Sequence, residues 1–218
     1  MTLRYRMVVF DWDGTVMDST SLIAQCIQRA AVATGLREPG TREAKAVIGL
    51  GVRDSIERLF PGIDSGQANT FGMHYRAHFL AHDHETPLYE GMRELLGALD
   101  QRERILAVAT GKSRRGLDRA LNHSGLAGRF QFTRCADEGF PKPHPDMLER
   151  LMDFAGVERG QVLMIGDTTH DLDLARNAGV DAVAVSYGAH PAALLVDQGA
   201  KAVVSSVGEL GEWLMRNA

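Results

Sequence analysis

The stretch VVFDWDGTVMD, residues 8–18, places two carboxylates where a short apolar run ends. Side chains alternate between the two faces of a strand, so we expect Asp11 and Asp13 to point the same way and Trp12 the opposite way. Two acids in one small space repel each other and raise a pKa, which costs stability unless a cation or acid chemistry uses them. This segment predicts the end of a buried strand with a charged site beside it.

Length and composition limit the classes of protein to consider. The chain has 218 residues, which suits one large domain or one domain with an insertion. Its 24 basic residues nearly balance its 28 acidic ones, and a net charge of −4 provides no global field for nucleic acid or an anionic membrane. We therefore expect neither as a partner, and an anionic substrate must be held by a local cluster of donors.

Cysteines and apolar runs bear on the compartment. Cys26 and Cys135 lie far apart and belong to no motif. The apolar run before Asp11 covers only residues 7–10, which is too short for a secretory signal, and no later run approaches membrane-spanning length. We expect a protein of a reduced, cytoplasmic compartment.

Short apolar runs alternate with helical patterns through the second half of the chain. The runs cover residues 105–109, 130–132, 162–165, 182–185 and 202–204, and residues 7–10 form the first of the series. The helical patterns RRGLDRALNHSG (114–125) and MLERLMDFAG (147–156) each end on a glycine suited to a helix C-terminus. Strands alternating with helices of this length predict a doubly wound, Rossmann-like α/β fold with a parallel sheet.

Residues 19–85 interrupt this alternation. They contain four consecutive helical patterns and no convincing strand: SLIAQCIQRAAVATG, TREAKAVIG, VRDSIERLF and QANTFGMHYRAHFLA. The interruption predicts a helical cap of residues 17–86 inserted into an α/β core of residues 1–16 and 87–218. The two chain crossings, near residues 15–18 and 86–87, can serve as hinges.

Polar residues gather where the predicted strands end. In open parallel sheets the ligand site lies beyond the carboxyl ends of the strands. The residues at or near such ends are Asp11, Asp13, Thr110, Gly111, Lys112, Lys142, Asp167 and Asp171. Two carboxylate pairs, a hydroxyl with adjacent backbone N–H groups and a lysine suit phosphoryl transfer.

Phosphoryl transfer requires this combination for physical reasons. A phosphoryl group in flight spreads charge over its equatorial oxygens, so it needs positive partners and N–H donors already in place, such as Lys142 and Thr110. Mg²⁺ takes oxygen ligands and bridges carboxylate to phosphate, which suits Asp11 and Asp167. One carboxylate can attack phosphorus and form an aspartyl-phosphate. Its neighbour can protonate the leaving oxygen and later take a proton from water.

Four elements in this order resemble the motifs of the haloacid dehalogenase superfamily. They are Asp-x-Asp-Gly-Thr (11–15), the strand-end Thr110, Lys142 and Gly-Asp-x-x-x-Asp (166–171). The inserted helices, LYEG (88–91), KPHP (142–145) and GDTTHDLDLARNAG (166–179) are similar to the phosphoglycolate phosphatase branch of that superfamily. An acid at position 13 argues against a C–halogen substrate, because dehalogenases of the superfamily usually lack it. Trp12 departs from the commoner aliphatic residue at its position.

The resemblance implies roles for individual residues. It implies that Asp11 is the nucleophile and that Asp13 is the acid/base and a Mg²⁺ ligand through its backbone. It implies that Thr110, with Gly111, and Lys142 bind phosphate and that Asp167 binds Mg²⁺. The resemblance implies that Asp171 either binds Mg²⁺ directly or contacts the residues that bind it.

Several residues keep two interpretations. Asp171 can instead be an early-turn carboxylate that interacts with a helix dipole. Lys112 either contacts substrate or is a solvated charge, and Ser113 suits a helix N-cap. The loop GLGVR (49–53) is either simple turn chemistry or a cap loop that reads the substrate through Arg53. His74, His78 and His82 share one helix face at metal-binding spacing, but no glutamate completes a zinc-protease motif, and three exposed histidines explain the pattern equally well.

The predicted function is Mg²⁺-dependent hydrolysis of a small phosphomonoester through an aspartyl-phosphate, with 2-phosphoglycolate as the first substrate to test. Nucleotidase, pyrophosphatase and β-phosphoglucomutase-like phosphotransferase activities stay open as alternatives. A non-catalytic phosphometabolite sensor is a further alternative, against which the intact acid pair argues. We expect a monomer or a homodimer.

Overall fold

A six-stranded parallel sheet forms the centre of the protein, whose computed structural model describes residues 4–218. The strand order is β3-β2-β1-β4-β5-β6. The strands are β1 (Met7–Phe10), β2 (Ile105–Thr110), β3 (Phe132–Cys135), β4 (Val162–Gly166), β5 (Asp181–Val185) and β6 (Ala202–Val204). The first strand lies at the centre, with Phe10 level with Val108 of β2 and Ile165 of β4. The predicted α/β class with a doubly wound sheet is confirmed.

Helices cover both faces of the sheet because successive apolar side chains of each strand point to opposite sides. On one face Val8 and Phe10 pack with helices α5 (Met92–Gln101), α6 (Arg114–His123) and α10 (Val207–Asn217). On the other face Met7 and Val9 pack with α7 (Asp146–Ala155), α8 (Thr169–Ala178) and α9 (Ala192–Leu195). The short 3-10 turns η2 (Arg159–Gln161) and η3 (Val196–Gln198) complete this core. Ser113 caps α6 as expected, since its hydroxyl accepts a hydrogen bond from the Gly116 N–H at 3.2 Å.

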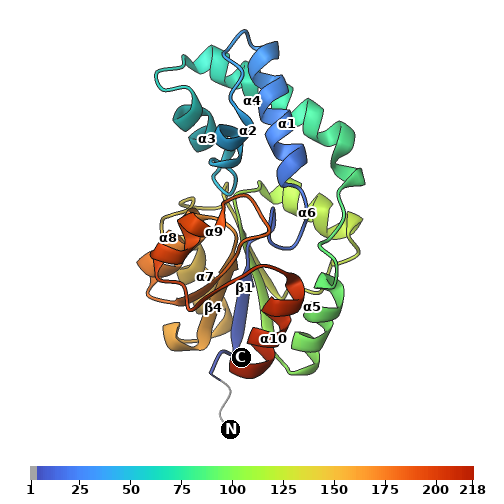
Figure 1. Ribbon diagram of the computed structural model, residues 1–218, viewed down its shortest axis with the longest axis vertical. Coiled ribbons are helices and arrows are strands. Elements are labelled where there is room, and N and C mark those ends of the chain that lie inside the picture. Colours follow the sequence, from blue (N-terminus) through green and yellow to red (C-terminus); the bar gives the residue numbers. More distant parts are fainter. Residues whose placement is uncertain (1–3) are drawn as a thin grey trace.

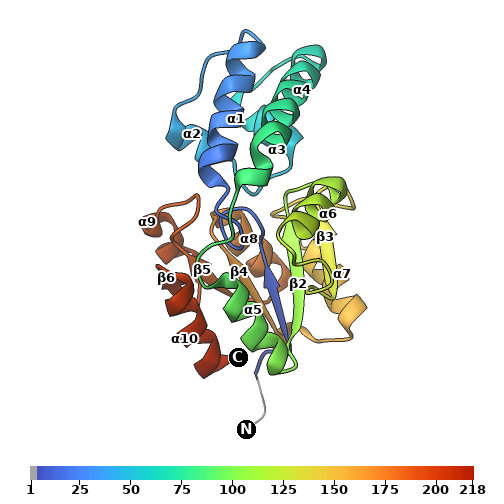
Figure 2. The same cartoon turned by 90° about the vertical axis from the view of Figure 1, so that its right-hand side faces the viewer.

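Four helices and one 3-10 turn form a cap above the carboxyl ends of the strands (Figures 1 and 2). They are α1 (Thr20–Ala33), α2 (Thr41–Lys45), α3 (Val52–Leu59), α4 (Ser65–His82) and η1 (Asp83–Glu85). Their buried side chains, among them Ile27, Ala44 and Phe71, form an apolar cluster separate from the two that line the sheet. The C-terminus lies at the opposite end of the molecule (Figure 1).

The two chain crossings between core and cap run side by side. Met17 bridges to Leu88, the Asp18 N–H donates to the Pro87 carbonyl at 3.0 Å, and the Tyr89 N–H donates to the Val16 carbonyl at 3.2 Å. The junction therefore falls where the crossings were expected. The division at residues 17 and 86 itself stays a prediction.

Two expected elements differ from the structure. The third strand begins at Phe132 and not at residue 130, because Phe130 is buried and packs edge-on against Phe10 and Trp12 before the strand starts. The helical pattern of residues 41–49 forms a helix only as far as Lys45. Gly49 has a φ of 91°, a conformation that favours glycine and that turns the chain toward the core.

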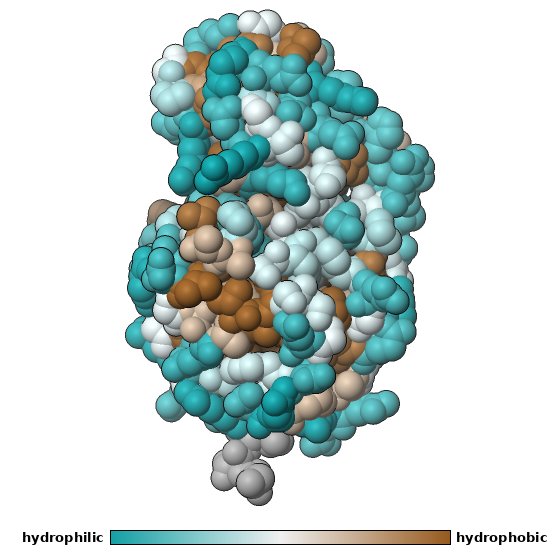
Figure 3. Space-filling view, in the orientation of Figure 1, coloured by the Kyte–Doolittle hydropathy of each residue, from teal (hydrophilic) through white to brown (hydrophobic). Residues whose placement is uncertain are grey.

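The surface reflects the division into cap and core. In the orientation of Figure 1, the cap is mostly hydrophilic, apolar side chains gather on the core below it, and the surface is indented between the two (Figure 3). Across the described residues, none of the helices combines the length and the apolar character needed to cross a bilayer.

Candidate active site

The predicted site residues meet at the carboxyl edge of the sheet. Asp11 follows β1, Thr110 ends β2 and Asp167 follows β4, while Lys142 comes from the loop between β3 and α7. All four are at most 2% exposed. Since parallel strands end at one edge, these separate motifs form one buried polar cluster.

Lys142 lies between two carboxylates. Its Nζ is 2.8 Å from Asp11 Oδ1 and 2.6 Å from Asp171 Oδ1. Burial alone would lower the pKa of Lys142, but the charges of Asp11 and Asp171 outweigh burial and raise it. The lysine is therefore held as a cation beside the predicted nucleophile.

Asp11 is buried and incompletely satisfied. Burial raises its pKa to about 7, against the lowering influence of Lys142. Lys142 is the charged partner of Asp11 Oδ1, whereas Asp11 Oδ2 has no hydrogen-bond partner among the described residues. A buried carboxylate with free lone pairs is placed to bind a cation or to attack an electrophile.

Asp167 and Asp171 are held in different ways. Asp167 accepts from the Thr15 hydroxyl at 2.9 Å and from the Ala189 N–H at 2.7 Å. Burial, with Asp11 and Asp171 nearby, raises the pKa of Asp167 well above its ordinary value. One oxygen of Asp171 accepts a hydrogen bond from Lys142. The other accepts from the N–H and the hydroxyl of Thr168, at 3.0 and 2.7 Å. Because Thr168 caps α8, the alternative of Asp171 as a helix-terminal carboxylate also has a structural basis.

Three carboxylates at this edge fit a hard divalent ion. Asp11, Asp167 and Asp171 each offer an oxygen, and these oxygens lie within 4.8 Å of one another. A single lysine does not neutralise three buried acids, and Oδ2 of Asp11 has no donor within residues 4–218. Oxygen donors with this excess negative charge suit Mg²⁺.

Asp13 faces the side of the site toward the cap. Its Oδ1 accepts a hydrogen bond from the Ser19 hydroxyl at 2.6 Å and pairs with Lys112 Nζ at 3.0 Å. Lys112 also lies over the ring of Phe79 from α4, 4.6 Å from its centre. Asp13, Ser19, Phe79 and Lys112 line a small pocket between cap and core, together with Arg119 and others. Lys112 is thus mostly buried and engaged, which excludes the solvated-charge interpretation.

Ser19 and Phe79 were missed by sequence reasoning. Ser19 carried a weak signal, since it is a polar residue at the start of the first cap helix, close after Asp13. Phe79 carried none, because its place over Lys112 depends on how the cap packs on the core.

The loop at residues 49–53 touches the core through its backbone. Gly111 approaches this loop so closely that a Cβ there would lie 2.6 Å from the Gly49 carbonyl oxygen and 2.7 Å from that of Leu50. Thr110 is fully buried beside it, and its hydroxyl accepts from the Lys112 N–H at 3.2 Å. Arg53 is exposed and makes no hydrogen bond or ion pair with the described residues, so the structure does not bring it into the buried cluster.

The histidines at 74, 78 and 82 do not gather into a metal site. Within residues 4–218, the aspartates are the one group of three or more candidate ligands close enough to share an ion. The three histidines are half-buried on α4, and the His82 ring bonds the carbonyl of His78 at 2.9 Å.

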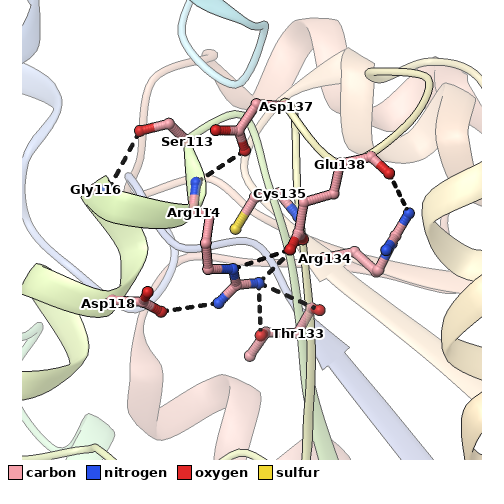
Figure 4. Close-up of polar contacts among 9 residues, drawn as sticks. All are labelled: Ser113, Arg114, Gly116, Asp118, Thr133, Arg134, Cys135, Asp137 and Glu138. Atoms are coloured by element: carbon pink, nitrogen blue, oxygen red, sulfur yellow. Dashed lines mark hydrogen bonds and ion pairs between the residues drawn. The ribbon is translucent and has the colours of Figure 1, made fainter.

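The loop that leads to Lys142 is anchored by Arg114 (Figure 4). The guanidinium of Arg114 donates to both carboxylate oxygens of Glu138 at 3.0 Å, to the Thr133 hydroxyl at 2.9 Å and to Asp118 at 2.9 Å. Its backbone N–H donates to Asp137 at 2.8 Å. The first turn of α6, strand β3 and the following loop are therefore tied together.

The chain belongs to the haloacid dehalogenase-like hydrolase family, whose model matches residues 8–185. It is 34% identical over 221 residues to a phosphoglycolate phosphatase of Rhodospirillum rubrum, covering 96% of this chain and 90% of the relative. It is 31% identical over 181 residues to the pyrophosphatase PpaX of Halalkalibacterium halodurans, covering 83% of each.

A solved structure agrees with this assignment. A predicted phosphatase from Clostridium acetobutylicum superposes with a TM-score of 0.86 at 25% identity, over 99% of this chain and 100% of the other. The chain is a phosphatase of this family, and such enzymes act on small phosphorylated substrates.

Proposed function

We propose that the protein hydrolyses a small phosphomonoester in a Mg²⁺-dependent reaction that passes through an aspartyl-phosphate on Asp11. The observation that carries the proposal is the buried Asp11 carboxylate, whose Oδ1 pairs with Lys142 at 2.8 Å and whose Oδ2 meets no hydrogen-bond donor among the described residues. A carboxylate oxygen with a free lone pair, next to a fixed cation, is arranged to attack phosphorus.

The first half of the proposed reaction transfers the phosphoryl group to the protein. An Asp11 oxygen forms a bond to phosphorus as the bond to the leaving oxygen breaks, and Asp13 gives that oxygen a proton. Lys142, the Thr110 hydroxyl and the neighbouring Gly111 N–H hold the phosphoryl oxygens in place. In the second half, Asp13 takes a proton from water as the water oxygen attacks phosphorus. The bond between Asp11 and phosphorus breaks, which frees the Asp11 carboxylate and releases inorganic phosphate.

Asp11, Asp167 and the backbone of Asp13 are the proposed ligands of Mg²⁺. The ion, when bound, neutralises charge on the phosphoryl oxygens and on the buried acids. Asp171 is the weaker candidate for a direct ligand, because both of its oxygens already accept hydrogen bonds from Lys142 and Thr168. We assign it the task of holding Lys142 toward Asp11.

Asp11→Asn tests the nucleophile. We expect the variant to fold normally and to lose activity by roughly a thousandfold or more, because an amide cannot form the acyl-phosphate. Phosphate release measured with malachite green across a panel of phosphometabolites provides the readout. Asp153→Asn, at an exposed carboxylate on α7, is the matched control and should retain wild-type turnover.

Chelation should abolish wild-type turnover and Mg²⁺ should restore it, whereas Ca²⁺ should restore it poorly. Turnover near the wild-type rate in Asp11→Asn, or in excess chelator, would refute the proposal.

We propose a carboxylated substrate such as 2-phosphoglycolate. The pocket beside Asp13 lies where the leaving group would sit, and Lys112 offers a cation there. Arg53 offers a planar fork from the cap loop above. The relatives include a phosphoglycolate phosphatase and a pyrophosphatase, so pyrophosphate belongs in the panel with nucleotides and sugar phosphates.

Arg53→Ala and Lys112→Gln test this substrate class. Either residue, if it grips the carboxylate, should lower kcat/KM for 2-phosphoglycolate by about 1.5–3 kcal/mol relative to an aryl phosphate that lacks the carboxylate. Arg42→Ala, at an exposed arginine on α2, is the control. If the ratio of the two kcat/KM values changes in neither variant, carboxylate recognition by these residues is wrong, while the nucleophile assignment stands on its own test.

We place the enzyme in the cytoplasm, where its two buried free cysteines remain reduced, and propose a monomer or homodimer.

A further inference from the structure

Two histidine rings of the core converge on one carbonyl of the cap. His170 lies in the first turn of α8, and His190 lies in the loop after β5. Their Nε2 atoms are 3.2 and 3.4 Å from the carbonyl oxygen of Ala46. Both residues are only 5% exposed, and their ring centres are 5.4 Å apart in an edge-to-face arrangement.

The surroundings of His190 determine which of its nitrogens carries the proton. The backbone N–H of Thr169 donates to His190 Nδ1 at 3.1 Å, so Nδ1 is an acceptor. In a neutral ring the proton is then on Nε2, which donates to Ala46. Burial lowers the pKa of both rings, which agrees with neutral histidines. A carbonyl oxygen has two lone pairs and can accept from both rings.

The carbonyl they hold is at a helix end. Ala46 is the C-cap of α2, where the last carbonyls of a helix lack partners within the helix. The chain that follows passes directly over the catalytic loops. A Cβ at Gly49 would lie 3.2 Å from Thr168 Oγ1, and the Gly49 and Leu50 carbonyls press on Gly111. A fixed position of the Ala46 carbonyl therefore fixes the distance between residues 46–51 and the proposed phosphoryl site.

Two other polar contacts between cap and core are exposed, and a third, from the Ser19 hydroxyl to Asp13, is buried but lies beside the chain crossing. On the α6 side, Arg119 pairs with Asp83 at 2.9 Å with about half of its side chain exposed, and the exposed His123 ring bonds the His84 carbonyl at 2.7 Å. Exposed pairs contribute little to holding two bodies together, whereas buried hydrogen bonds are costly to leave unmade. The buried histidine pair is the contact suited to define the closed position of the cap loop.

We propose that His170 and His190 form a latch that holds the cap loop, residues 46–51, closed over the phosphoryl site. They are positioning residues, since their rings bond the cap backbone, while the backbone N–H of His190 donates to the Asp167 carbonyl at 3.3 Å. The latch ties the loop to α8, whose first turn also carries Asp171, so closure of the cap and placement of the acids are mechanically linked.

Isosteric variants separate the two hydrogen bonds of His190. Asparagine can keep the acceptor for Thr169 N–H in place of Nδ1 but is too short to reach Ala46. Glutamine extends a donor to the position of Nε2. Hydrogen exchange of the amides of residues 47–51 reports the latch without requiring turnover, so this readout does not rest on the proposed function.

We expect the double variant His170→Asn/His190→Asn to exchange the amides of residues 47–51 about tenfold faster or more, since each lost hydrogen bond is worth several-fold. The amides of β1 and β4 should keep their protection. For the proposed substrate kcat/KM should fall, and His190→Gln should retain most of both the protection and the kcat/KM. His74→Asn, on α4, is the control for introducing asparagine at a cap histidine. If the double variant does not fold, the two single asparagine variants carry the test.

Two results would overturn the latch. One is unchanged exchange of the loop amides in the asparagine variants. The other is equal loss of protection in His190→Gln and His190→Asn, which would mean that the ring matters by its shape and not by its donor. If the asparagine variants lose loop protection but the wild-type protein shows no phosphatase activity, the latch is supported and only the proposed function is contradicted.

Discussion

Asp167 lies in a gap that two glycines leave open. A Cβ at Gly14 or at Gly188 would overlap Asp167 Oδ2, and a Cβ at Gly188 would also overlap the Gly14 carbonyl oxygen. The next residue, Ala189, donates its N–H to the same carboxylate oxygen. At this scale the site depends on the absence of single methyl groups as much as on the presence of charged ones.

Gly188→Ala should therefore remove activity without unfolding the protein. The added methyl group pushes the Gly188 backbone away and takes the Ala189 donor out of reach, so Asp167 is misplaced. Misplacement by about 1 Å costs on the order of a hundredfold in rate, and we expect kcat/KM to fall by at least about that factor. Gly160→Ala is the control, because a Cβ there would meet nothing within 4 Å. Equal activity of the two variants would mean that the close packing of Gly188 against Asp167 is not needed for catalysis.

At the scale of elements, Arg114 joins helix α6 to strand β3 and to the loop that follows this strand (Figure 4). It connects the first turn of α6 with β3 and with Glu138 in the loop before Lys142. Glu138 also accepts from the Cys135 N–H at 2.8 Å. Burial alone would raise the pKa of Glu138, but these bonds outweigh burial and hold its pKa below the ordinary value.

Arg114→Ala should destabilise the fold by about 1–2 kcal/mol, because it removes charge-assisted hydrogen bonds that are partly exposed. Arg115→Ala is the control, since Arg115 is exposed and has no hydrogen bond or ion pair within the described part of the chain. Denaturant unfolding of both variants measures the difference. A carboxyl group whose pKa is lower in the folded than in the unfolded protein stabilises the fold at any pH above its unfolded-state pKa. This stabilisation is lost as the pH falls through its folded-state pKa. The difference between the variants should therefore shrink in acid, below about pH 4.5. A constant difference down to pH 2 would contradict this account.

At the scale of the whole molecule, the site lies where the cap meets the carboxyl ends of the strands (Figures 1 and 2). The fold class and the meeting of Asp11, Thr110 and Asp167 could be predicted because each of these residues ends or directly follows a strand whose pattern is local. Lys142 lies farther along the loop after β3, and its motif, rather than a strand end, indicated its place. In a parallel sheet such motifs must meet at one edge, whatever the lengths of the segments between them.

The remainder of the site could not be predicted, for a physical reason. Lys112 with Phe79, His190 with Ala46 and Arg114 with Glu138 are pairs between segments whose relative placement is set by packing. No periodicity in the sequence reports such packing. The start of β3 was misplaced for the same reason, since Phe130 has strand-like character but its ring is used to cover Trp12.

The central position of β1 also has a consequence for biosynthesis. Met7 is translated well before Ile105 and Val162, which are its neighbours in the sheet. The cap helices, whose apolar side chains mainly pack on one another, emerge from the ribosome before either neighbour and can fold while the first strand waits. Asp11 is thus made early and placed late. The loop that contains Ala189, whose N–H donates to Asp167, is translated after five of the six strands and after the whole cap. A chain that ends between residues 171 and 186 would therefore contain every proposed catalytic residue but lack the Ala189 donor to Asp167.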